Sequence, residues 1–334
     1  MRMTHVFAAA AALPVLLSMA ALSVAHGAEN EGPLWAYPQP PAQPAPPEPE
    51  DTRLKSVPNS TLRRTLRQAE SSQDVPDWHP NNHPAAPDII LHGHNPISEA
   101  CGHCHLPNGR GGPMTAPALA GLPATYILQT LADFRSGARS SAIKWSAGRM
   151  MSFVLRATDP GPLPPGAAED LKQAAEYYAA LPAKPSIRVV EAPMAPQIKY
   201  EGQIYVAVAG APDQAIGNRI VEVPEDAERT ALRDSETGFV AYVPLGSIER
   251  GGDLVTRGRS GVTACVVCHG MGLGGLGPVP PLAGRSPSYL ARQIYDMQSG
   301  ARAGEWSALM MPVVPTLTQA DIVAIAAYAA SRSP

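Results

Sequence analysis

Apolar side chains recur at helical spacing in two stretches of the chain, one in each half. They occupy residues 126–128 and 131 in the first stretch, and residues 289, 290 and 294 in the second. Side chains three or four residues apart share one face of a helix, so each stretch is predicted to be a helix with one buried side. Both stretches belong to an internal repeat, because residues 117–139 align with residues 280–302 without a gap. We therefore expect two copies of one small helical unit.

Each half closes with a further predicted helix, at residues 169–181 and at residues 318–330. The interval from an early aspartate to a later tyrosine is the same in both. Thr318 followed by Asp321 is suited to cap the start of the later helix, because a threonine oxygen can accept a hydrogen bond from a free backbone N–H.

The segment between the halves, residues 184–245, follows a different pattern. Its short runs rich in Val, Ile and aromatic residues are bounded by Pro and Gly, which is typical of strands joined by turns. These runs are 187–190, 204–208, 219–223 and 239–243, and a candidate turn lies at 234–238. We predict a small strand-containing insertion that either braces the two helical units or offers a docking face to a partner.

The first residues predict export from the cytoplasm. Residues 6–25 form an almost unbroken apolar run, followed by small residues at Ala25, Gly27 and Ala28 where cleavage is plausible. This order is typical of a secretory signal peptide, which we place at residues 1–27. An uncleaved membrane anchor is the alternative, since the run approaches the ~20 residues that span a bilayer. No cysteine lies near the cleavage site, which excludes a lipid anchor on a new N-terminal Cys.

Residues 28–86 are rich in proline, most of all at 38–49. Proline favours extended polyproline conformation and donates no backbone hydrogen bond, so we expect an N-terminal arm and not a domain. Its large apolar residues are expected to pack back on the protein's own helical domains, with partner docking as the alternative. These residues are Trp35, Tyr37 and Trp78.

Composition narrows the classes of function. A net charge of −3 is too small to indicate nucleic acid or a strongly charged partner. With 37 prolines, 29 glycines and only 5% aromatic residues, the chain is predicted to be loop-rich and short of large side chains for its core. A bound apolar cofactor would supply that missing bulk.

All four cysteines lie in two C-x-x-C-H motifs, a pattern that attaches haem covalently. Two thiols on one helical turn can reach the two vinyl groups of a haem, and the adjacent imidazole can bind its iron. A four-thiolate zinc site is the alternative, but it would have to join two separate repeats. We predict two covalent haem c groups, bound by Cys101, Cys104 and His105 and by Cys265, Cys268 and His269.

Each half also carries a pair of methionines before its last helix. A thioether is a soft, neutral ligand that stabilises reduced iron. Equal distances to the following threonine favour Met150 and Met310 as the sixth iron ligands. Equal distances from the preceding tryptophan pair Met150 with Met311 instead, so Met151 and Met311 remain alternatives.

Histidines offer a competing ligand set for the first haem only. His269 is the one histidine after His105, so the second haem is expected to have His/Met ligation unless the N-terminal part reaches it. Bis-histidine ligation of the first haem would need a displaced methionine. The histidines available for it are His79, His83, His92, His94 and His103.

Two further pairs of repeated residues are expected near the haems. Pro117 and Pro280 could each accept a hydrogen bond from the N–H of the axial histidine, which would fix the orientation of its ring. Pro113 and Pro278 are alternatives that spacing leaves open. Arg139 and Arg302 follow a glycine at a helix end, where they either pair with a haem propionate or cap the helix.

The order C-x-x-C-H, Pro-x-Leu-Ala-Gly, Tyr, Ser-Gly-Ala-Arg, Met and a final Ala-rich helix occurs twice and resembles the tandem dihaem class I cytochromes c. The resemblance implies a mainly α fold with two cytochrome c class I haem domains, at residues 87–183 and 246–334. The chain departs from this family in a Pro/Gly-rich loop at 159–166 and in the insertion at 184–245, where the simplest members have a short linker.

The resemblance also implies a function: transfer of single electrons in the periplasm, as part of a respiratory chain. The donor would be a dehydrogenase or a quinol-oxidising complex, and the acceptor an oxidase or a reductase. Two six-coordinate irons leave no open position, so we expect an electron carrier without catalytic residues. The alternatives are a cytochrome subunit of a membrane-associated dehydrogenase complex and a dihaem peroxidase, which needs an exchangeable sixth ligand and nearby acid or base groups.

Overall fold

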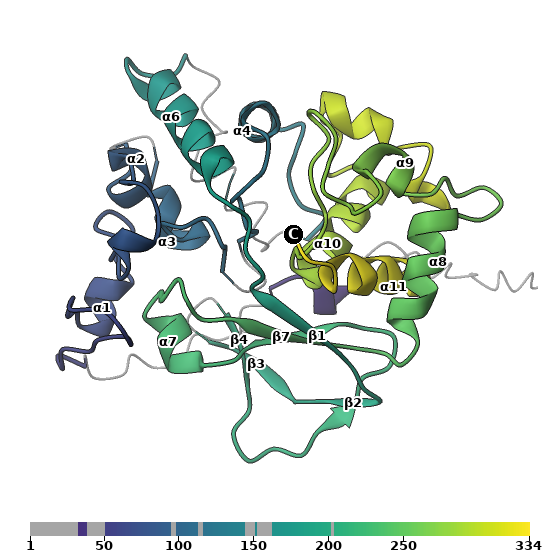
Figure 1. Ribbon diagram of the computed structural model, residues 1–334, viewed down its shortest axis with the longest axis horizontal. Coiled ribbons are helices and arrows are strands. Elements are labelled where there is room, and N and C mark those ends of the chain that lie inside the picture. Colours follow the sequence, from purple (N-terminus) through teal and green to yellow (C-terminus); the bar gives the residue numbers. More distant parts are fainter. Residues whose placement is uncertain are drawn as a thin grey trace, which may run out of the picture. The chain divides into compact units, whose positions relative to one another are not determined.

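The computed structural model describes residues 33–38, 51–94, 98–112, 116–143, 151, 162–201 and 204–334 (Figure 1). The expected signal peptide, most of the proline run, Pro113 and Met150 lie outside the described residues. Contacts divide the chain into Met1–Asn30 and Glu31–Pro334, and all the described helices and strands belong to the second unit. Among the described residues, no helix combines the length and apolar character that crossing a bilayer requires.

The first helical unit contains the short α2 (Asp88–Leu91), α3 (Cys101–His105), α4 (Ala124–Ser136) and α6 (Ala167–Ala180). The predicted helix in the repeat is α4, which ends where Gly137 takes a left-handed conformation, with φ of 76°. The expected helix at 169–181 is α6. The two pack together through a core of Ile89, Ile90, Ala120, Leu122, Ile127, Ala174, Ala175, Tyr178 and Leu181.

The second helical unit repeats this order with α8 (Ser247–Arg257), α9 (Val266–His269), α10 (Pro287–Gln298) and α11 (Gln319–Ala330). Two short 3₁₀ helices, Glu305–Leu309 and Val314–Thr316, precede α11. The predicted cap is confirmed: the Thr318 hydroxyl accepts from the Asp321 N–H, and the Asp321 carboxylate accepts from the Thr318 N–H. Helix α8 lies so close to α11 that any side chain at Gly251 would meet the carbonyl of Ala324.

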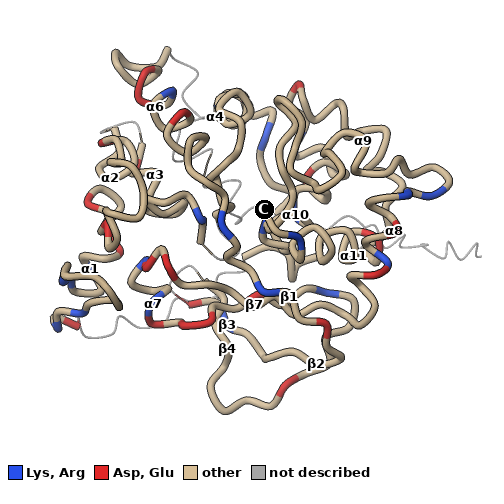
Figure 2. Tube along the Cα trace, viewed as in Figure 1, with Lys and Arg blue, Asp and Glu red and all other residues tan. Residues whose placement is uncertain are grey.

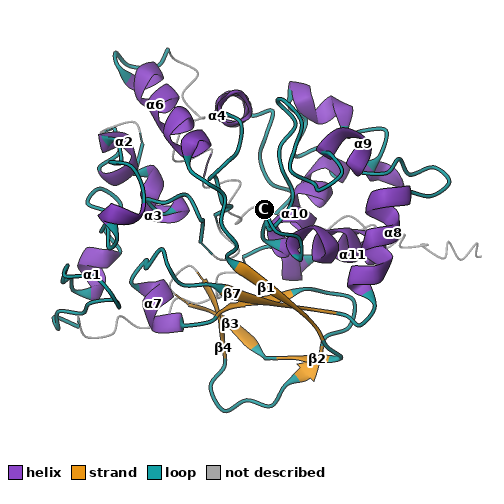
Figure 3. Ribbon diagram, in the orientation of Figure 1, coloured by secondary structure: helices purple, strands orange, loops and turns teal. Residues whose placement is uncertain are grey.

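The insertion forms strands, as its pattern predicts (Figure 3). The predicted runs are β1 (Ile187–Glu191), β4 (Ile204–Ala207), β6 (Val221–Pro224) and β7 (Phe239–Val243). In the three-stranded sheet, β7 lies between β1 and β6, parallel to β1 and antiparallel to β6. Elements that the pattern did not predict are β2 (Met194–Ala195), β3 (Ile198–Glu201), β5 (Gln214–Ala215) and α7 (Ala227–Ala231).

The described parts of the N-terminal arm are folded against the rest of the chain. Residues 33–38 include a 3₁₀ turn, Leu34–Ala36, and the buried Tyr37 hydroxyl donates to the Asp296 carboxylate of α10 at 3.0 Å. Residues 51–86 contain α1 (Leu66–Ala69) and a second 3₁₀ turn, Pro80–Asn82.

Trp78 differs from the expectation that it packs on a helical domain. Its indole N–H donates to the carbonyl of Leu232, in the insertion, at 2.7 Å. Val57, Ala69 and Leu232 complete the buried cluster around it. The prolines are concentrated before residue 50, so this later part of the arm retains enough apolar side chains to form a small core.

Candidate haem sites

The two C-x-x-C-H motifs each form one short helical turn. The first motif is α3 itself, and the second comprises α9 with Cys265 at its N-cap. Both turns end immediately after the histidine at a residue with positive φ, 63° at Leu106 and 80° at Gly270. None of the four thiols forms a disulfide, so both pairs are free to make thioether bonds.

The histidine of each motif is held by a proline carbonyl, as the repeat predicts. The Nδ1 of His105 lies 2.8 Å from the carbonyl oxygen of Pro117, and the Nδ1 of His269 lies 2.9 Å from that of Pro280. Pro278 is therefore not the acceptor. Within the described residues, no hydrogen-bond partner lies on either Nε2. A carbonyl on Nδ1 fixes the tautomer that presents a lone pair at Nε2, the atom needed to bind iron.

Burial shifts the pKa of the two motif histidines in the direction that iron binding requires. It lowers the pKa of His105 and of His269, although the proline carbonyl opposes part of the effect. Both imidazoles are therefore neutral at pH 7, which is the form that binds a metal. Burial also raises the pKa of Cys101 to about 12 and that of Cys265 to about 11.

The methionine pairs are described in part. Met310 is partly buried at the end of a 3₁₀ helix, whereas Met311 is 42% exposed. A side chain that binds iron must turn inward, so the difference in burial favours Met310. Met151 is partly buried, and its neighbour Met150 lies outside the described residues.

Several histidines proposed as alternative ligands of the first haem contact carboxylates instead. The ring of His79 contacts Asp234 at 2.9 Å, that of His83 contacts Asp77 at 3.2 Å, and that of His94 contacts Asp170. His103 is buried between the two thiols. Burial, aided by the charge of Arg233, lowers its pKa to about 4.

Arg139 and Arg302 make a contact that the sequence alone did not predict. Arg139 donates to the Tyr289 hydroxyl of the second half at 3.2 Å, and Arg302 donates to the Tyr126 hydroxyl of the first half at 2.9 Å. The two arginines are equivalent in the repeat, and so are the two tyrosines. Burial alone would raise the pKa of Tyr126, but the charges of Arg302 and Arg139 outweigh it and lower the pKa to about 8. The signal was present in the repeat, but an alignment does not show which half each arginine contacts.

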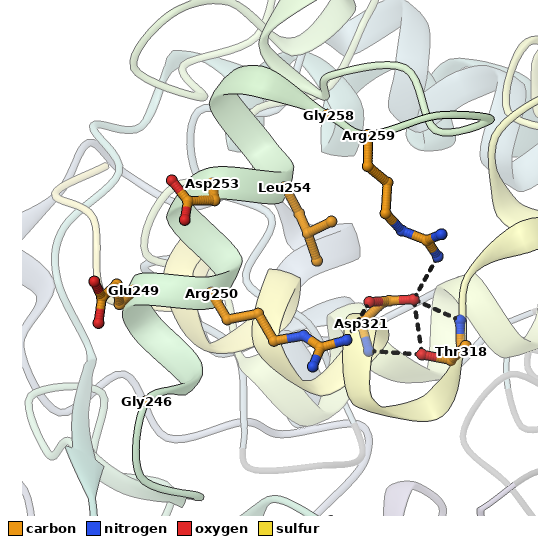
Figure 4. Close-up of a pocket in the computed structure, with 9 residues that line it drawn as sticks. All are labelled: Gly246, Glu249, Arg250, Asp253, Leu254, Gly258, Arg259, Thr318 and Asp321. Atoms are coloured by element: carbon orange, nitrogen blue, oxygen red, sulfur yellow. Dashed lines mark hydrogen bonds and ion pairs between the residues drawn. The ribbon is translucent and has the colours of Figure 1, made fainter.

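An open hollow between α8 and α11 contains none of the motif residues (Figure 4). Arg250 and Arg259 converge there on the buried carboxylate of Asp321, at 2.7 and 2.8 Å. Burial would raise the pKa of Asp321, but hydrogen bonds from the arginines and Thr318 hold it well below its usual range. Both guanidinium groups are occupied by this carboxylate, so the hollow is a structural junction between the two helices.

Comparison with known proteins identifies the family. A thiosulfate dehydrogenase electron acceptor from Thiomonas intermedia is 30% identical over 239 residues, which cover 71% of this chain and 80% of that protein. The chain belongs to the tandem dihaem class I cytochromes c. Residues 254–328 of this dihaem cytochrome match the family model described as cytochrome C oxidase, cbb3-type, subunit III. Cytochrome c4 of Azotobacter vinelandii is 25% identical over 231 residues, covering 68% of this chain and 82% of that protein. Among solved structures, reduced recombinant cytochrome c4 from Pseudomonas stutzeri has a TM-score of 0.44 at 21% identity, covering 70% of this chain and 93% of that one.

Membership in this family settles the class of activity. The protein is a dihaem electron carrier and not an enzyme, with two covalently bound haem c groups and their irons as cofactors. The peroxidase hypothesis gains no support from these relatives. The residues present fit the cofactor: each half offers two free thiols on one turn and a neutral, oriented imidazole with an unpartnered Nε2 among the described residues.

Proposed function

We propose that this dihaem cytochrome receives single electrons from a thiosulfate-oxidising dehydrogenase in the periplasm and passes them to an oxidase or a reductase. The donor is inferred from a relative that is named as the electron acceptor of thiosulfate dehydrogenase. A quinol-oxidising complex is the alternative donor. Bound haem supplies the chemistry, since its iron accepts and releases one electron.

In this proposal, Cys101, Cys104, Cys265 and Cys268 form the thioethers, and the Nε2 atoms of His105 and His269 bind the irons. Met150 and Met310 are the opposite ligands. The observation that carries the assignment is the histidine–proline hydrogen bond, which occurs in both halves with nearly the same length, 2.8 and 2.9 Å. The protein's part is to orient each imidazole, keep it neutral and shield it from water.

Mass analysis and an absorption spectrum of the mature protein test the assignment. Two haems should be fixed to the chain, and the oxidised protein should show the weak thioether-to-iron band at the red end of the spectrum. Met310→Ala should remove the contribution of one haem to that band, whereas Met311→Ala should leave it unchanged. Fewer than two covalent haems, or a band that only Met311→Ala reduces, would contradict the proposed ligands.

Reduction by a purified thiosulfate dehydrogenase tests the donor. With thiosulfate and that enzyme present, the cytochrome should be reduced at a rate that rises with enzyme concentration. Heat-inactivated enzyme is the control. If a quinol-oxidising complex reduces the protein and the thiosulfate enzyme does not, the donor assignment is wrong. Fractionation should place the protein in the periplasm.

A second candidate is a cytochrome subunit held within a larger membrane-associated complex. The 184–245 insertion favours it, because this segment holds none of the expected haem ligands yet has its own strands and buried cluster. Stoichiometric co-purification with a dehydrogenase after mild extraction would support the subunit, and recovery of free protein would support the shuttle.

A further inference from the structure

The two C-x-x-C-H motifs differ in the exposure of the side chains at their third and fourth positions. In the second motif, Cys268 is exposed and Val267 is 65% exposed. In the first motif, Cys104 is only partly exposed, and His103, which holds the position of Val267, is 6% exposed. A thioether bonds the edge of the porphyrin to the cysteine sulfur. Val267 and His103 make no such bond, so the exposure of their side chains indicates how open the surface beside each thioether is.

The first motif is covered in part by residues 71–79, which precede it in the chain. The N–H of Ala100 donates to the carbonyl of Ser72 at 2.8 Å, which joins residues 71–79 to the start of α3. Helix α2 lies against the same turn, because a Cβ at Gly102 would lie 2.7 Å from the carbonyl oxygen of Ile90. The backbone of the motif is thus enclosed on this side.

A second layer comes from the insertion, through the loop at residues 232–236. His79 contacts the Asp234 carboxylate of this loop at 2.9 Å, and the Arg229 guanidinium contacts the other oxygen of that carboxylate at 2.7 Å. Asn108, which follows the motif, donates to the carbonyl of Ser235 at 3.0 Å. The loop is therefore fastened both to the arm and to the haem-binding turn.

Arg110, which also follows the motif, joins it to the insertion as well. Its guanidinium donates to the carbonyl of Ser235 at 3.1 Å and to that of Pro185 at 2.7 Å. At the second motif the neighbouring surface is open instead, and Met271 is 81% exposed.

We propose that residues 71–79 and the loop 232–236 cover the first haem edge, so that external redox proteins exchange electrons with this cytochrome only at the site of Cys268 and His269. The proposal rests on the haem ligands of the proposed function. The iron that His269 would hold would take one electron from a donor protein, and that electron would then pass within the molecule to the iron that His105 would hold. Electron tunnelling weakens steeply with distance, so a covered edge exchanges slowly with a partner of protein size.

Hydroxyl-radical footprinting of the holoprotein gives a readout that does not depend on electron transfer. Val267 and Met271 should be oxidised readily, and His103 should be protected. Asp234→Ala removes the carboxylate that joins His79 to Arg229, and should increase oxidation of His103 several-fold. If that variant does not fold, Asn108→Ala removes the hydrogen bond to Ser235 and should also increase oxidation of His103. Asp253→Ala, at an exposed acid on α8, is the matched control. Oxidation of His103 as fast as that of Val267 in the wild type would overturn the proposal.

Stopped-flow reduction by a protein donor tests the route. The wild type should show a fast phase proportional to donor concentration and a slower phase independent of it. Met271→Arg should change the fast rate constant several-fold, whereas Leu54→Arg, at a 53% exposed apolar residue of the arm, should not. Two phases that both rise with donor concentration would overturn the proposal. The haem count by mass remains a separate test of the proposed function, so the two failures can be told apart.

Discussion

The two copies of the repeat hold their histidines alike but lie in different surroundings. His105 and His269 each contact the equivalent proline carbonyl. The arm and the insertion are hydrogen-bonded to Ala100 and Asn108, on either side of the turn around His105, whereas Cys268, beside His269, is exposed. The geometry that orients the ligand is local and repeats with the sequence. Access to that ligand depends on distant segments, which are not repeated, and it can differ between two otherwise equivalent sites.

Loss of the cysteines of one motif should give the largest effect, the loss of one covalent haem. Cys265→Ala with Cys268→Ala should reduce the haem content from two to one, because the two remaining cysteines belong to the first motif. Mass analysis of the mature protein measures this directly. The matched change at Cys101 and Cys104 should give the same count. If both variants retained two covalent haems, the assignment of the motifs would be wrong.

Asp296 and Asp133 hold equivalent positions in the repeat and should differ in their effect on stability. Asp296 is buried and accepts from the Tyr37 hydroxyl at 3.0 Å and the Ala142 N–H at 2.9 Å. Asp296→Ala leaves the buried Tyr37 hydroxyl and the partly buried Ala142 N–H without this acceptor, so we expect a loss of about 2–4 kcal/mol in the free energy of unfolding. Asp133 is partly exposed and accepts from Gln129 within the same helix. Asp133→Ala should cost less than about 1 kcal/mol. Equal losses in denaturant titrations would contradict this difference between the halves.

Asp296 should also make stability depend on pH. Burial raises its pKa above the ordinary value of 3.8, and hydrogen bonds from Ala142 and Tyr37 offset only part of the rise. The folded protein then binds this proton more tightly than the unfolded chain. Its contribution to stability is full below pH 3.8 and is lost as the pH rises through the folded-state pKa. The free energy of unfolding of the wild type should fall across this window relative to Asp296→Asn. Leu245→Ala, at a 66% exposed residue, changes no titratable group and should run parallel to the wild type.

The last helices of the two halves begin differently. Helix α11 has a side-chain cap at Thr318, whereas α6 begins at Gly166, which makes no side-chain hydrogen bond. Thr318→Ala should lower the free energy of unfolding by about 1 kcal/mol. Denaturant titration measures the change, and Thr318→Ser is the matched control that keeps a hydroxyl. A loss as large in the serine variant would show that the cap is not the cause.

The crossed contacts between the halves should give small effects of similar size in the two halves. Tyr126→Phe removes one acceptor of Arg302, and Tyr289→Phe removes one acceptor of Arg139. Gln293 still accepts from both arginines. Each change should cost about 0.5–1.5 kcal/mol, the usual net worth of one hydrogen bond. Thermal or denaturant unfolding of the two variants checks the prediction. A large loss in only one of them would show that the contacts are not equivalent.

Features that depend on nearby residues could be predicted from the sequence. The period of apolar side chains predicted α4 and α10, and the Thr318–Asp321 pair predicted a cap. The repeat offered Pro117 and Pro280 as acceptors for the histidines, although spacing alone left Pro113 and Pro278 open. The runs of Val, Ile and aromatic residues also predicted the longer strands β1, β4, β6 and β7. The two-residue strands β2 and β5 are too short to have a detectable period.

Contacts between distant segments could not be predicted in the same way. The bond from Trp78 to Leu232 joins the later part of the N-terminal arm to a loop 154 residues away, and neither stretch has a pattern that identifies its partner. The contacts of Arg139 and Arg302 with tyrosines of the opposite half could not be predicted for the same reason. Figure 2 shows both signs of charge scattered along the described elements, so charge does not mark these partners either.

The bond between Asn108 and Ser235 spans 127 residues, and this separation sets an order of events during synthesis. A chain that emerges from its N-terminus presents Cys101 and Cys104 before the loop that will enclose them exists. Attachment of the first porphyrin can therefore precede closure of its cover. This order applies to the first motif, because Cys268 and Val267 of the second motif are exposed.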